Sequence, residues 1–324
     1  MGTWLKWGLG LLAAVGMPQL QAQVGAPVVE LQQQDAMVLP SADRAMMLAS
    51  VRTGNRVVAV GDHGVVLISE GTGAGFRQAK KVPTRATLND VYFVDDKEGW
   101  AAGHWGVILH TTDRGETWVR QRSENSVDQP LFAVHFFDSL HGLAAGLWSL
   151  LLSTEDGGKT WKSVQVPAPE GARKADKNLY AIVSDNKGLI IIAAEQGWVY
   201  RSTDGGNTWA AVTTGGKASY WTGLILDDGS VLVAGLTGKI ARSTDSGKTW
   251  VLVESGSKTS SITSLRQSPD GVIVGVGLEG LQLVSHDRGL SFQATQRGDR
   301  LPMTNLLPTS PFIASTPTGF VNLK

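Results

Sequence analysis

The stretch TTDRGETW at residues 111–118 recurs along the chain at nearly constant intervals. The closing aromatic residues of its six copies are separated by 42, 43, 48, 41 and 42 residues. A fixed period of this length is typical of repeat architectures, in which each repeat buries its apolar face only by stacking on its neighbours. The other copies are SEGTGAGF (69–76), TEDGGKTW (154–161), STDGGNTW (202–209), STDSGKTW (243–250) and SHDRGLSF (285–292).

Each repeat is predicted to contain four short antiparallel strands. Runs rich in β-branched and apolar residues alternate with turns that contain glycine and aspartate. Small residues fill the second run of several repeats, so neighbouring sheets can approach closely. Four-stranded units repeated radially form a β-propeller. In the repeat at 87–123, the expected strands are 88–94, 100–103, 107–111 and 118–121.

The number of blades follows from the turn between the second and third strands, which occurs seven times. The seventh unit reaches residue 324 just after its third strand, and we predict that its fourth strand comes from Pro27–Leu31. Pairing the two termini in one sheet would remove both exposed edges. The predicted fold is therefore all-β: a seven-bladed β-propeller with four antiparallel strands per blade, closed by N- and C-terminal strands in one blade. The counted turns lie at 61–64, 103–106, 146–149, 194–197, 235–238, 277–280 and 316–319.

The first 22 residues differ from the rest. Lys6 precedes an uncharged, mostly apolar run at 7–17 that is too short to span a bilayer, and a small residue follows at Ala22. This pattern is typical of a secretory signal peptide cleaved near Ala22, with a retained membrane anchor as the alternative. Residues 23–324 are then expected to form a single propeller domain in the periplasm or outside the cell.

The composition excludes several classes of function. Lys and Arg total 29, as do Asp and Glu, so the chain has no bulk field that would hold nucleic acid or an anionic membrane. There is no cysteine, which excludes disulfides, thiolate metal sites and cysteine nucleophiles. We expect a monomer that has no cofactor, does not bind nucleic acid and does not insert into the membrane once the signal is removed.

The repeated motif is the Asp-box, for which we predict a structural role. Its carboxylate can accept backbone N–H groups in the turn between the third and fourth strands, and the closing aromatic residue can pack between blades. Calcium binding is the alternative, but each box offers one carboxylate, so no metal site is expected. The residues assigned to this role are Asp113, Trp118, Asp156, Trp161, Asp204, Trp209, Asp245, Trp250, Asp287 and Phe292.

Asp-boxes within a propeller occur in two families. This chain resembles the photosystem II stability/assembly factor family over essentially its whole mature length. The matching features are the five Asp-boxes that retain the aspartate and the blade pattern GWAAGHWGVILHTTDRGETW (99–118), with relatives at 141–161 and 230–250. The resemblance implies a secreted, non-enzymatic seven-bladed propeller that binds partner membrane proteins while their complex is assembled. In photosynthetic members of the family, the complex serves photosynthesis.

The other family is the sialidases, which give the alternative of a glycan-binding or glycan-hydrolysing propeller. Such a hydrolase needs three convergent arginines, a tyrosine nucleophile beside a glutamate and an acidic proton donor.

The six histidines show no paired metal spacing, although His63 and His104 occupy equivalent turns of adjacent blades. We expect no catalytic residue. Ordinary packing in strands is expected for all four tyrosines: Tyr92, Tyr180, Tyr200 and Tyr220.

A partner is predicted to dock on the face that carries the strand 2–3 turns and the blade-to-blade connections. Large aromatic residues at turn tips are candidate anchors, and basic residues in the connections would form a rim around them. The alternatives are aromatic residues that fold back over the channel mouth and basic residues that are simply solvated. The predicted partner is a membrane protein facing the periplasm. The candidates are His63, His104, Trp105, Trp148, Trp198, Lys80, Lys81, Arg85, Arg122, Arg173, Lys174 and Lys177.

Overall fold

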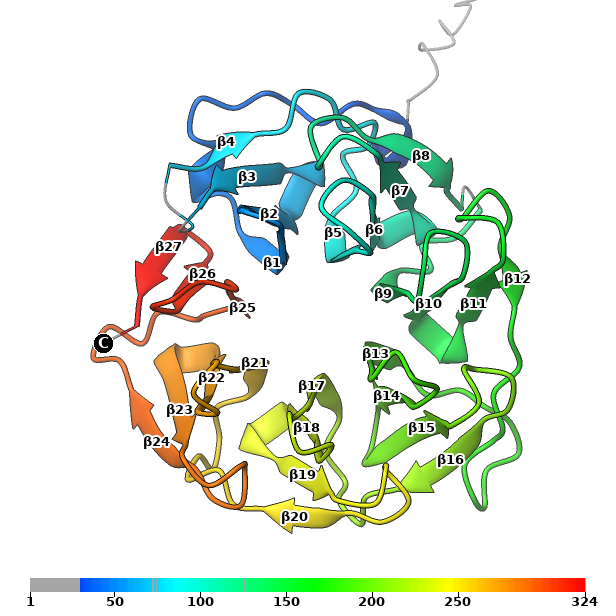
Figure 1. Ribbon diagram of the computed structural model, residues 1–324, viewed down its shortest axis with the longest axis vertical. Coiled ribbons are helices and arrows are strands. Elements are labelled where there is room, and N and C mark those ends of the chain that lie inside the picture. The colour runs from blue at the N-terminus through cyan, green and yellow to red at the C-terminus, as the bar shows by residue number, and fades with distance from the viewer. Residues whose placement is uncertain (1–29, 72, 74, 125, 324) are drawn as a thin grey trace, which may run out of the picture.

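The computed structural model describes residues 30–71, 73, 75–124 and 126–323, which form a ring of seven antiparallel sheets (Figure 1). Six sheets have four strands and the seventh has three. The predicted seven-bladed β-propeller is confirmed. Blades 1 to 4 comprise β1 (Met47–Thr53), β2 (Arg56–Gly61), β3 (Val66–Glu70), β4 (Arg77–Gln78), β5 (Leu88–Phe93), β6 (Gly99–Gly103), β7 (Ile108–Thr111), β8 (Val119–Arg122), β9 (Leu131–Phe136), β10 (Gly142–Gly146), β11 (Leu151–Thr154), β12 (Lys162–Ser163), β13 (Leu179–Ser184), β14 (Ile190–Ala194), β15 (Trp198–Ser202) and β16 (Ala210–Thr213).

The remaining blades are built in the same way, and short 3-10 turns mark the ends of several second strands. Blades 5 to 7 comprise β17 (Tyr220–Ile225), β18 (Val231–Gly235), β19 (Ile240–Ser243), β20 (Val251–Val253), β21 (Ile262–Gln267), β22 (Ile273–Gly277), β23 (Leu281–Ser285), β24 (Gln293–Gln296), β25 (Asn305–Leu306), β26 (Ile313–Thr316) and β27 (Gly319–Asn322). The 3-10 turns are η1 (Leu31–Gln33), η2 (Ala42–Arg44), η3 (Asp62–Gly64), η4 (His104–Gly106), η5 (Leu147–Ser149), η6 (Leu236–Gly238) and η7 (Leu278–Gly280).

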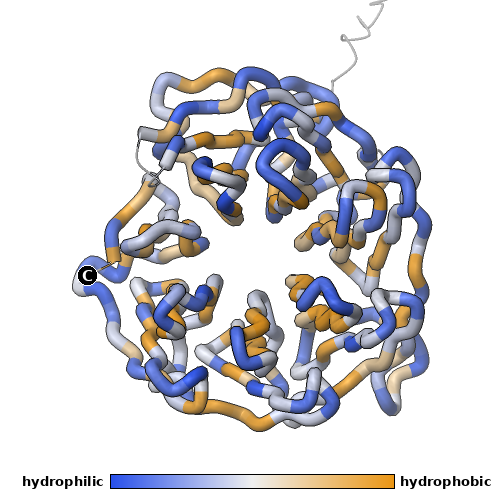
Figure 2. The backbone as a smooth tube through the Cα atoms, in the orientation of Figure 1, coloured by the Kyte–Doolittle hydropathy of each residue, from blue (hydrophilic) through white to orange (hydrophobic). Residues whose placement is uncertain are grey.

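The second strand of each of the first five blades is buried at every position. A blade lies between two neighbouring blades, so both faces of its sheet must be apolar. Figure 2 shows the result, with hydrophobic residues along the strands and hydrophilic residues in the turns. The core is therefore a series of clusters between blades, such as the one that joins Val60 and Ile68 of blade 1 to Val91 and Leu109 of blade 2.

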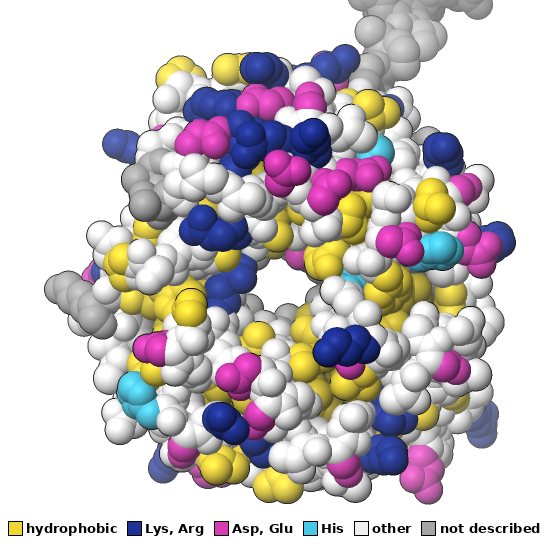
Figure 3. All heavy atoms as spheres, in the orientation of Figure 1, with side chains coloured by type: hydrophobic (Ala, Val, Ile, Leu, Met, Phe, Trp, Pro, Cys, Tyr) yellow, Lys and Arg dark blue, Asp and Glu magenta, His cyan; other side chains and the backbone are white. Residues whose placement is uncertain are grey.

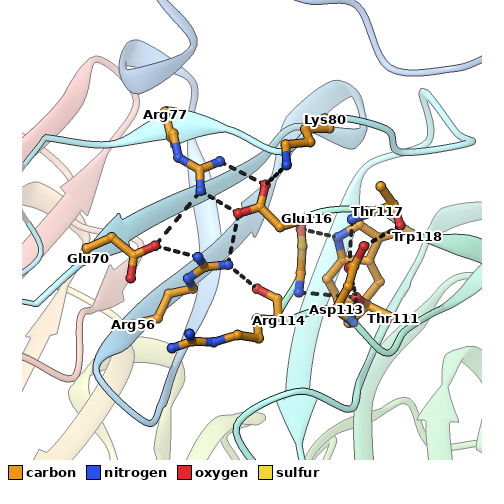
Figure 4. Close-up of polar contacts among 11 residues, drawn as sticks. Arg56, Glu70, Arg77, Lys80, Thr111, Asp113, Arg114, Glu116, Thr117 and Trp118 are labelled. Carbon is orange, nitrogen blue, oxygen red and sulfur yellow. Dashed lines mark hydrogen bonds and ion pairs between the residues drawn. The ribbon is translucent and has the colours of Figure 1, made fainter.

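The aspartate of each repeated motif holds its own turn by hydrogen bonds. Asp156 Oδ1 accepts the Thr160 N–H at 2.9 Å and its Oδ2 accepts the Thr160 hydroxyl at 2.6 Å. Thr154 Oγ1 donates to Asp156 Oδ1 at 2.8 Å and accepts the Gly158 N–H at 2.9 Å. Trp161 Nε1 donates to the Gly158 carbonyl at 3.1 Å. The same carboxylate bonds recur at Asp113 (Figure 4), Asp204, Asp245 and Asp287.

Blade 7 differs from the prediction, because its sheet has three strands in the described part of the chain. The expected fourth strand, Pro27–Leu31, falls partly on residues 27–29, which lie outside the described residues. Leu31 itself lies in η1, where its carbonyl accepts the Arg85 N–H at 2.8 Å. The Ala36 N–H donates to the Val82 carbonyl at 2.8 Å. The segment around η1 thus contacts the connection between blades 1 and 2. The prediction that Leu31 pairs with blade 7 is therefore wrong.

Side chains join blade 7 to blade 1 instead. Thr304 Oγ1 and Ser315 Oγ donate to the Met47 carbonyl at 2.6 and 2.7 Å. Asn305 Nδ2 donates to Ser50 Oγ at 2.6 Å. These bonds reach the innermost strand of blade 1, so blade 7 is attached at the wall of the channel.

An arginine from blade 6 extends this junction. Arg266 Nε donates to the Leu306 carbonyl of blade 7 at 2.5 Å, and its Nη2 donates to the Ser50 carbonyl of blade 1 at 2.7 Å. One side chain therefore joins three consecutive blades. On the outer side, the rings of Phe76 and Phe320 stack with centroids 4.3 Å apart.

The Asp-box bonds predict how an Asp156→Asn variant responds to pH. Hydrogen bonds from Thr160 lower the pKa of Asp156 to about 2. A carboxyl group whose pKa is lower in the folded state adds stability above its unfolded pKa of about 4 and loses it as the pH falls through about 2. The variant should melt a few degrees below the wild type at pH 7, and the difference should shrink toward pH 2. Thermal melts at pH 7, 4 and 2.5 test this, with Lys159→Gln in the same turn as control. A difference that does not change with pH would contradict it.

Candidate binding site at the mouth of the central channel

The centre of the ring is an open channel with a volume of about 1240 Å³, lined mainly by the first strands of the blades. In Figure 3 it opens at the middle of the molecule, with basic side chains along the margin of blades 7 and 1, and hydrophobic side chains together with a basic one along the margin of blades 3 and 4. Arg52 and Arg266 contribute to the lining. The two sides of the channel therefore differ in chemistry.

A β-bulge recurs at the start of the first strand in six blades. In blade 2, Leu88 pairs with Gly103 and Asp90 with Ala102, which leaves Asn89 as the extra residue. A side chain on Gly103 would meet the Thr87 carbonyl, because a Cβ atom there would lie 2.0 Å from that oxygen. A bulge bends its strand and re-aims a side chain. The extra residues all line the channel; they are Leu48, Asn89, Phe132, Tyr180, Trp221 and Thr263.

Three consecutive bulges carry aromatic side chains, and we call Phe132, Tyr180 and Trp221 the aromatic arc. All three are half-buried in the channel wall and belong to none of the core clusters between blades. The rings of Phe132 and Tyr180 lie 5.3 Å apart with an interplanar angle of 35°. The Tyr180 hydroxyl donates to Glu195 Oε1 at 3.1 Å. The arc lies at the end of the channel that carries the strand 2–3 turns.

The aromatic arc is not evident from the sequence, and ordinary packing was expected for Tyr180, which lines the channel instead. A bulge cannot be read from a single repeat. The signal that could have revealed it is an aromatic residue at the second position of three successive first strands, in LFA (131–133), LYA (179–181) and YWT (220–222).

Asp90 of blade 2 also faces the channel, next to the bulged Asn89. Its Oδ1 accepts the Val91 N–H and its Oδ2 accepts the Val134 N–H, both at 2.9 Å. Its deep position raises its pKa to about 7, because burial disfavours the charged form more than the two N–H donors and the positive charge of Arg266 favour it. Near neutral pH this carboxyl group therefore gains or loses a proton within the channel.

The predicted aromatic tips lie on the same face as the arc but differ in exposure. Trp105 and Trp148 are the central residues of η4 and η5, with φ of 56° and 55°. Trp148 is 58% exposed, whereas Trp105 packs against the core cluster of blades 1 and 2. Trp198 is likewise half-buried against the cluster of blades 3 and 4. His63, at the tip of η3, is exposed.

Both tips are held by the connection that follows. Asp128 Oδ1 accepts the Trp105 N–H at 2.6 Å, and Asp128 Oδ2 lies 2.9 Å from His104 Nδ1. Asn178 Oδ1 accepts the Trp148 N–H at 2.9 Å. An acceptor from the following connection thus stabilises each left-handed tip.

The predicted basic rim is not one patch. Lys80 and Lys81 lie beside the Asp-box turn of blade 2, and this corrects their expected place on the turn-tip face. The Lys80 N–H donates to the Glu116 carbonyl at 2.8 Å, and Lys80 Nζ lies 3.6 Å from the Glu116 carboxylate. Arg56 and Arg77 bind the same carboxylate (Figure 4), which receives Arg56 Nη1 at 3.1 Å. Glu116 thus holds blade 2 against blade 1.

The other predicted basic residues stay near the connections. Arg85 Nε donates to the Asp35 carbonyl at 3.0 Å, and Arg122 Nη1 donates to the Gly106 carbonyl at 2.7 Å. Lys177 Nζ donates to Gln196 at 2.9 Å and lies 3.2 Å from Asp176. Arg173 and Lys174 are exposed in the connection between blades 3 and 4. As partner-binding residues, all of them remain predictions.

Known proteins similar to this chain include one protein family and several solved propeller structures. A family model described as photosynthesis system II assembly factor YCF48 matches residues 72–222, which confirms the resemblance to that family. No curated protein matches. A solved structure described as YCF48 bound to D1 peptide is 19% identical and has a TM-score of 0.67, with 91% of this chain and 97% of that chain covered. YCF48 from Cyanidioschyzon merolae is 14% identical, with coverages of 88% and 97% and a TM-score of 0.66.

The extracellular domain of a putative hybrid two component system, BT4673 from B. thetaiotaomicron, is also similar. It is 14% identical with a TM-score of 0.64, over 89% of this chain and 39% of that chain. At these identities the solved structures show the fold alone. Within the described ranges, no helix is long and apolar enough to cross a membrane, and no group of three or more acidic or histidine side chains is placed to hold a metal ion.

Asp90 predicts a second pH dependence, opposite in sign to that of the Asp-boxes. The pKa of Asp90 is raised on folding. Its contribution to the free energy of unfolding is therefore fully present below the unfolded pKa of about 4 and is lost as the pH rises through about 7. Between pH 5 and 8 the unfolding free energy of the wild type should fall relative to Asp90→Asn by up to about 3 kcal/mol, because the folded pKa of about 7 lies about two units above pH 5 and one pKa unit corresponds to about 1.4 kcal/mol.

Urea unfolding at several pH values measures this difference. Asn keeps one acceptor and leaves one N–H unpaired. This lowers the unfolding free energy of the variant by an amount that does not change with pH. The slope with pH is therefore the readout. Parallel pH profiles for the two proteins would contradict the prediction.

Proposed function

We propose that this chain is a non-catalytic, exported propeller that binds a protein partner on its turn-tip face. In this proposal it acts as a scaffold or assembly factor for a membrane protein complex that faces the periplasm. The resemblance to the assembly factor family supports the class of function, and a solved relative is described as bound to a peptide. The structural observation behind the proposal is Trp148, a large aromatic residue whose backbone is held by a hydrogen bond to Asn178 and which is 58% exposed.

Trp148 has the properties of a binding anchor. Trp is enriched among the residues that contribute most to protein interfaces, because it buries a large area at a low cost in side-chain entropy. The backbone of Trp148 and of Ser149 is left-handed, with φ of 55° and 58°. Non-glycine residues adopt this conformation at a cost, so two in succession must be held by their surroundings.

The connection between blades 3 and 4 supplies both the support and a set of charges. Ser149 donates its N–H to the Lys177 carbonyl at 2.8 Å, next to the Asn178 that binds the Trp148 N–H. The same connection carries the exposed Arg173 and Lys174. An apolar anchor held by a connection that also carries basic residues suits a partner segment that combines an aromatic or aliphatic residue with acidic ones.

One observation favours the glycan-active alternative. The Tyr180 hydroxyl lies 3.1 Å from Glu195, which is the pairing that a sialidase uses for its nucleophile. Burial and the nearby Glu195 raise the pKa of Tyr180, so the phenol stays protonated and is a poor nucleophile. Of the described arginines, two line the channel rather than three. We therefore expect no turnover of a fluorogenic sialoside; measurable hydrolysis that is lost in Tyr180→Phe would replace this proposal.

Partner capture tests the proposal. Trp148→Ala should weaken capture from detergent-solubilised membranes at least tenfold, because an anchor of this kind contributes about 2 kcal/mol or more. Stability should change by less than about 0.5 kcal/mol, since the side chain is exposed and the backbone strain is retained. The double variant Arg173→Glu, Lys174→Glu should also weaken capture and make it less dependent on salt.

Matched controls use exposed residues elsewhere. Leu290→Ala removes a side chain that is 64% exposed in an Asp-box turn, and Lys187→Glu reverses a charge in a strand 1–2 turn. Both should leave capture unchanged. Capture quantified by mass spectrometry that is equal for Trp148→Ala and the wild type would remove the proposal.

A further inference from the structure

We infer that the aromatic arc of Phe132, Tyr180 and Trp221 is a second binding site, distinct from the turn tips, and that it takes a quaternary ammonium group. Such a group spreads its positive charge over methyl groups and is attracted to the faces of aromatic rings. This site lies in the channel wall and needs no contact with Trp148. It therefore does not rest on the proposed partner-binding function.

The fold places these rings where packing does not require them. Each is the extra residue of a bulge, and together they line one continuous cavity from three successive blades. Large aromatic side chains are the main contributors to protein cores, yet these three are left outside every core cluster among the described residues. Apolar surface that stays accessible in a concave site is characteristic of a ligand pocket.

The carboxyl groups beside the arc favour a cation. Asp90 lines the same cavity and is bonded to the Val134 N–H, two residues from Phe132. Glu195 accepts the hydroxyl of Tyr180. Neither Asp90 nor Glu195 forms an ion pair within the described ranges of the chain. Lys177, the basic residue nearest in sequence to Tyr180, is paired with Asp176.

The hydrogen bond from the Tyr180 hydroxyl to Glu195 also changes the electrostatics of the Tyr180 ring. A phenol that donates to a carboxylate gains electron density, which increases the negative potential on the ring face that a cation contacts. The arginines of the channel are directed elsewhere, because Arg52 and Arg266 donate to carbonyl groups of Pro308, Leu306 and Ser50. The aromatic side of the channel thus presents apolar rings with carboxyl groups beside them and, among the described residues, no basic side chain directed at them, which matches a methylated ammonium ion better than an anion or a neutral sugar.

Choline and its neutral isostere 3,3-dimethyl-1-butanol separate charge from shape. Ligand-observed NMR titrations with the full chain should show choline binding with a dissociation constant in the millimolar range and at least fivefold weaker binding of the isostere. Trp221→Leu and Phe132→Leu should each weaken choline binding roughly three- to tenfold, whereas Trp221→Phe should largely retain it. Equal binding of choline and the isostere, or no detectable choline binding, would overturn the inference.

Trp148→Leu is the matched control, because it removes an indole from the same face but not from the channel. It should leave choline binding unchanged, while Trp221→Leu should leave partner capture unchanged, so the two proposals can fail separately. Thermal melts establish that each variant is folded; a folded Trp221→Leu protein with wild-type choline affinity would contradict the site. Competition by phosphatidylcholine vesicles would identify the ammonium as a lipid head group, and its absence would identify a soluble ion.

Discussion

The structure depends on the burial of both faces of every blade. A strand such as β6 has no exposed position, so each sheet is stable only when it lies between two others. A linear array would leave two apolar faces in water, and closing the ring removes both. The contact between blades 7 and 1 is therefore required by all seven sheets, and in the described part of the chain it is made by side-chain bonds to Met47 and Ser50 and not by a shared strand. Such bonds contribute about 1 kcal/mol each, and several act together here.

A second constraint connects the fold to the site. A glycine ends the second strand of most blades because a backbone carbonyl at the start of the first strand approaches too closely for a Cβ atom. Examples are Gly103 beside the Thr87 carbonyl and Gly146 beside the Pro130 carbonyl. The partner strand accommodates this approach with a bulge, and the bulge turns one side chain into the channel. The chemistry of the channel mouth is thus set by one position per repeat. Aromatic residues at this position in blades 3, 4 and 5 produce an asymmetric channel in a symmetric fold.

The repeat period and turn chemistry made the blades predictable, since both are local properties of the sequence. Ring closure was not predictable in the same way. Pro27–Leu31 has the apolar, β-branched character of a strand, but Leu31 is bound by the N–H of Arg85 between blades 1 and 2. Lys80 was misplaced for a related reason. Its position in a connection is clear from the sequence, whereas its contact with Glu116 of the next blade arises only when the two sheets pack.

Trp105 and Trp148 show how far equivalence within a repeat extends. They share a turn, a left-handed backbone and an N–H acceptor in the next connection, so their backbones are equivalent. Their side chains are not, because Trp105 packs on the core of blades 1 and 2 whereas the ring of Trp148 is left in solvent. Hydrogen bonds from the backbone N–H groups of Trp148 and Ser149 to Asn178 and Lys177 fix the backbone of the exposed tip before any partner arrives. An anchor ordered in advance loses little conformational entropy on binding, which makes exposure at this one tip more consistent with recognition than with a gap in packing.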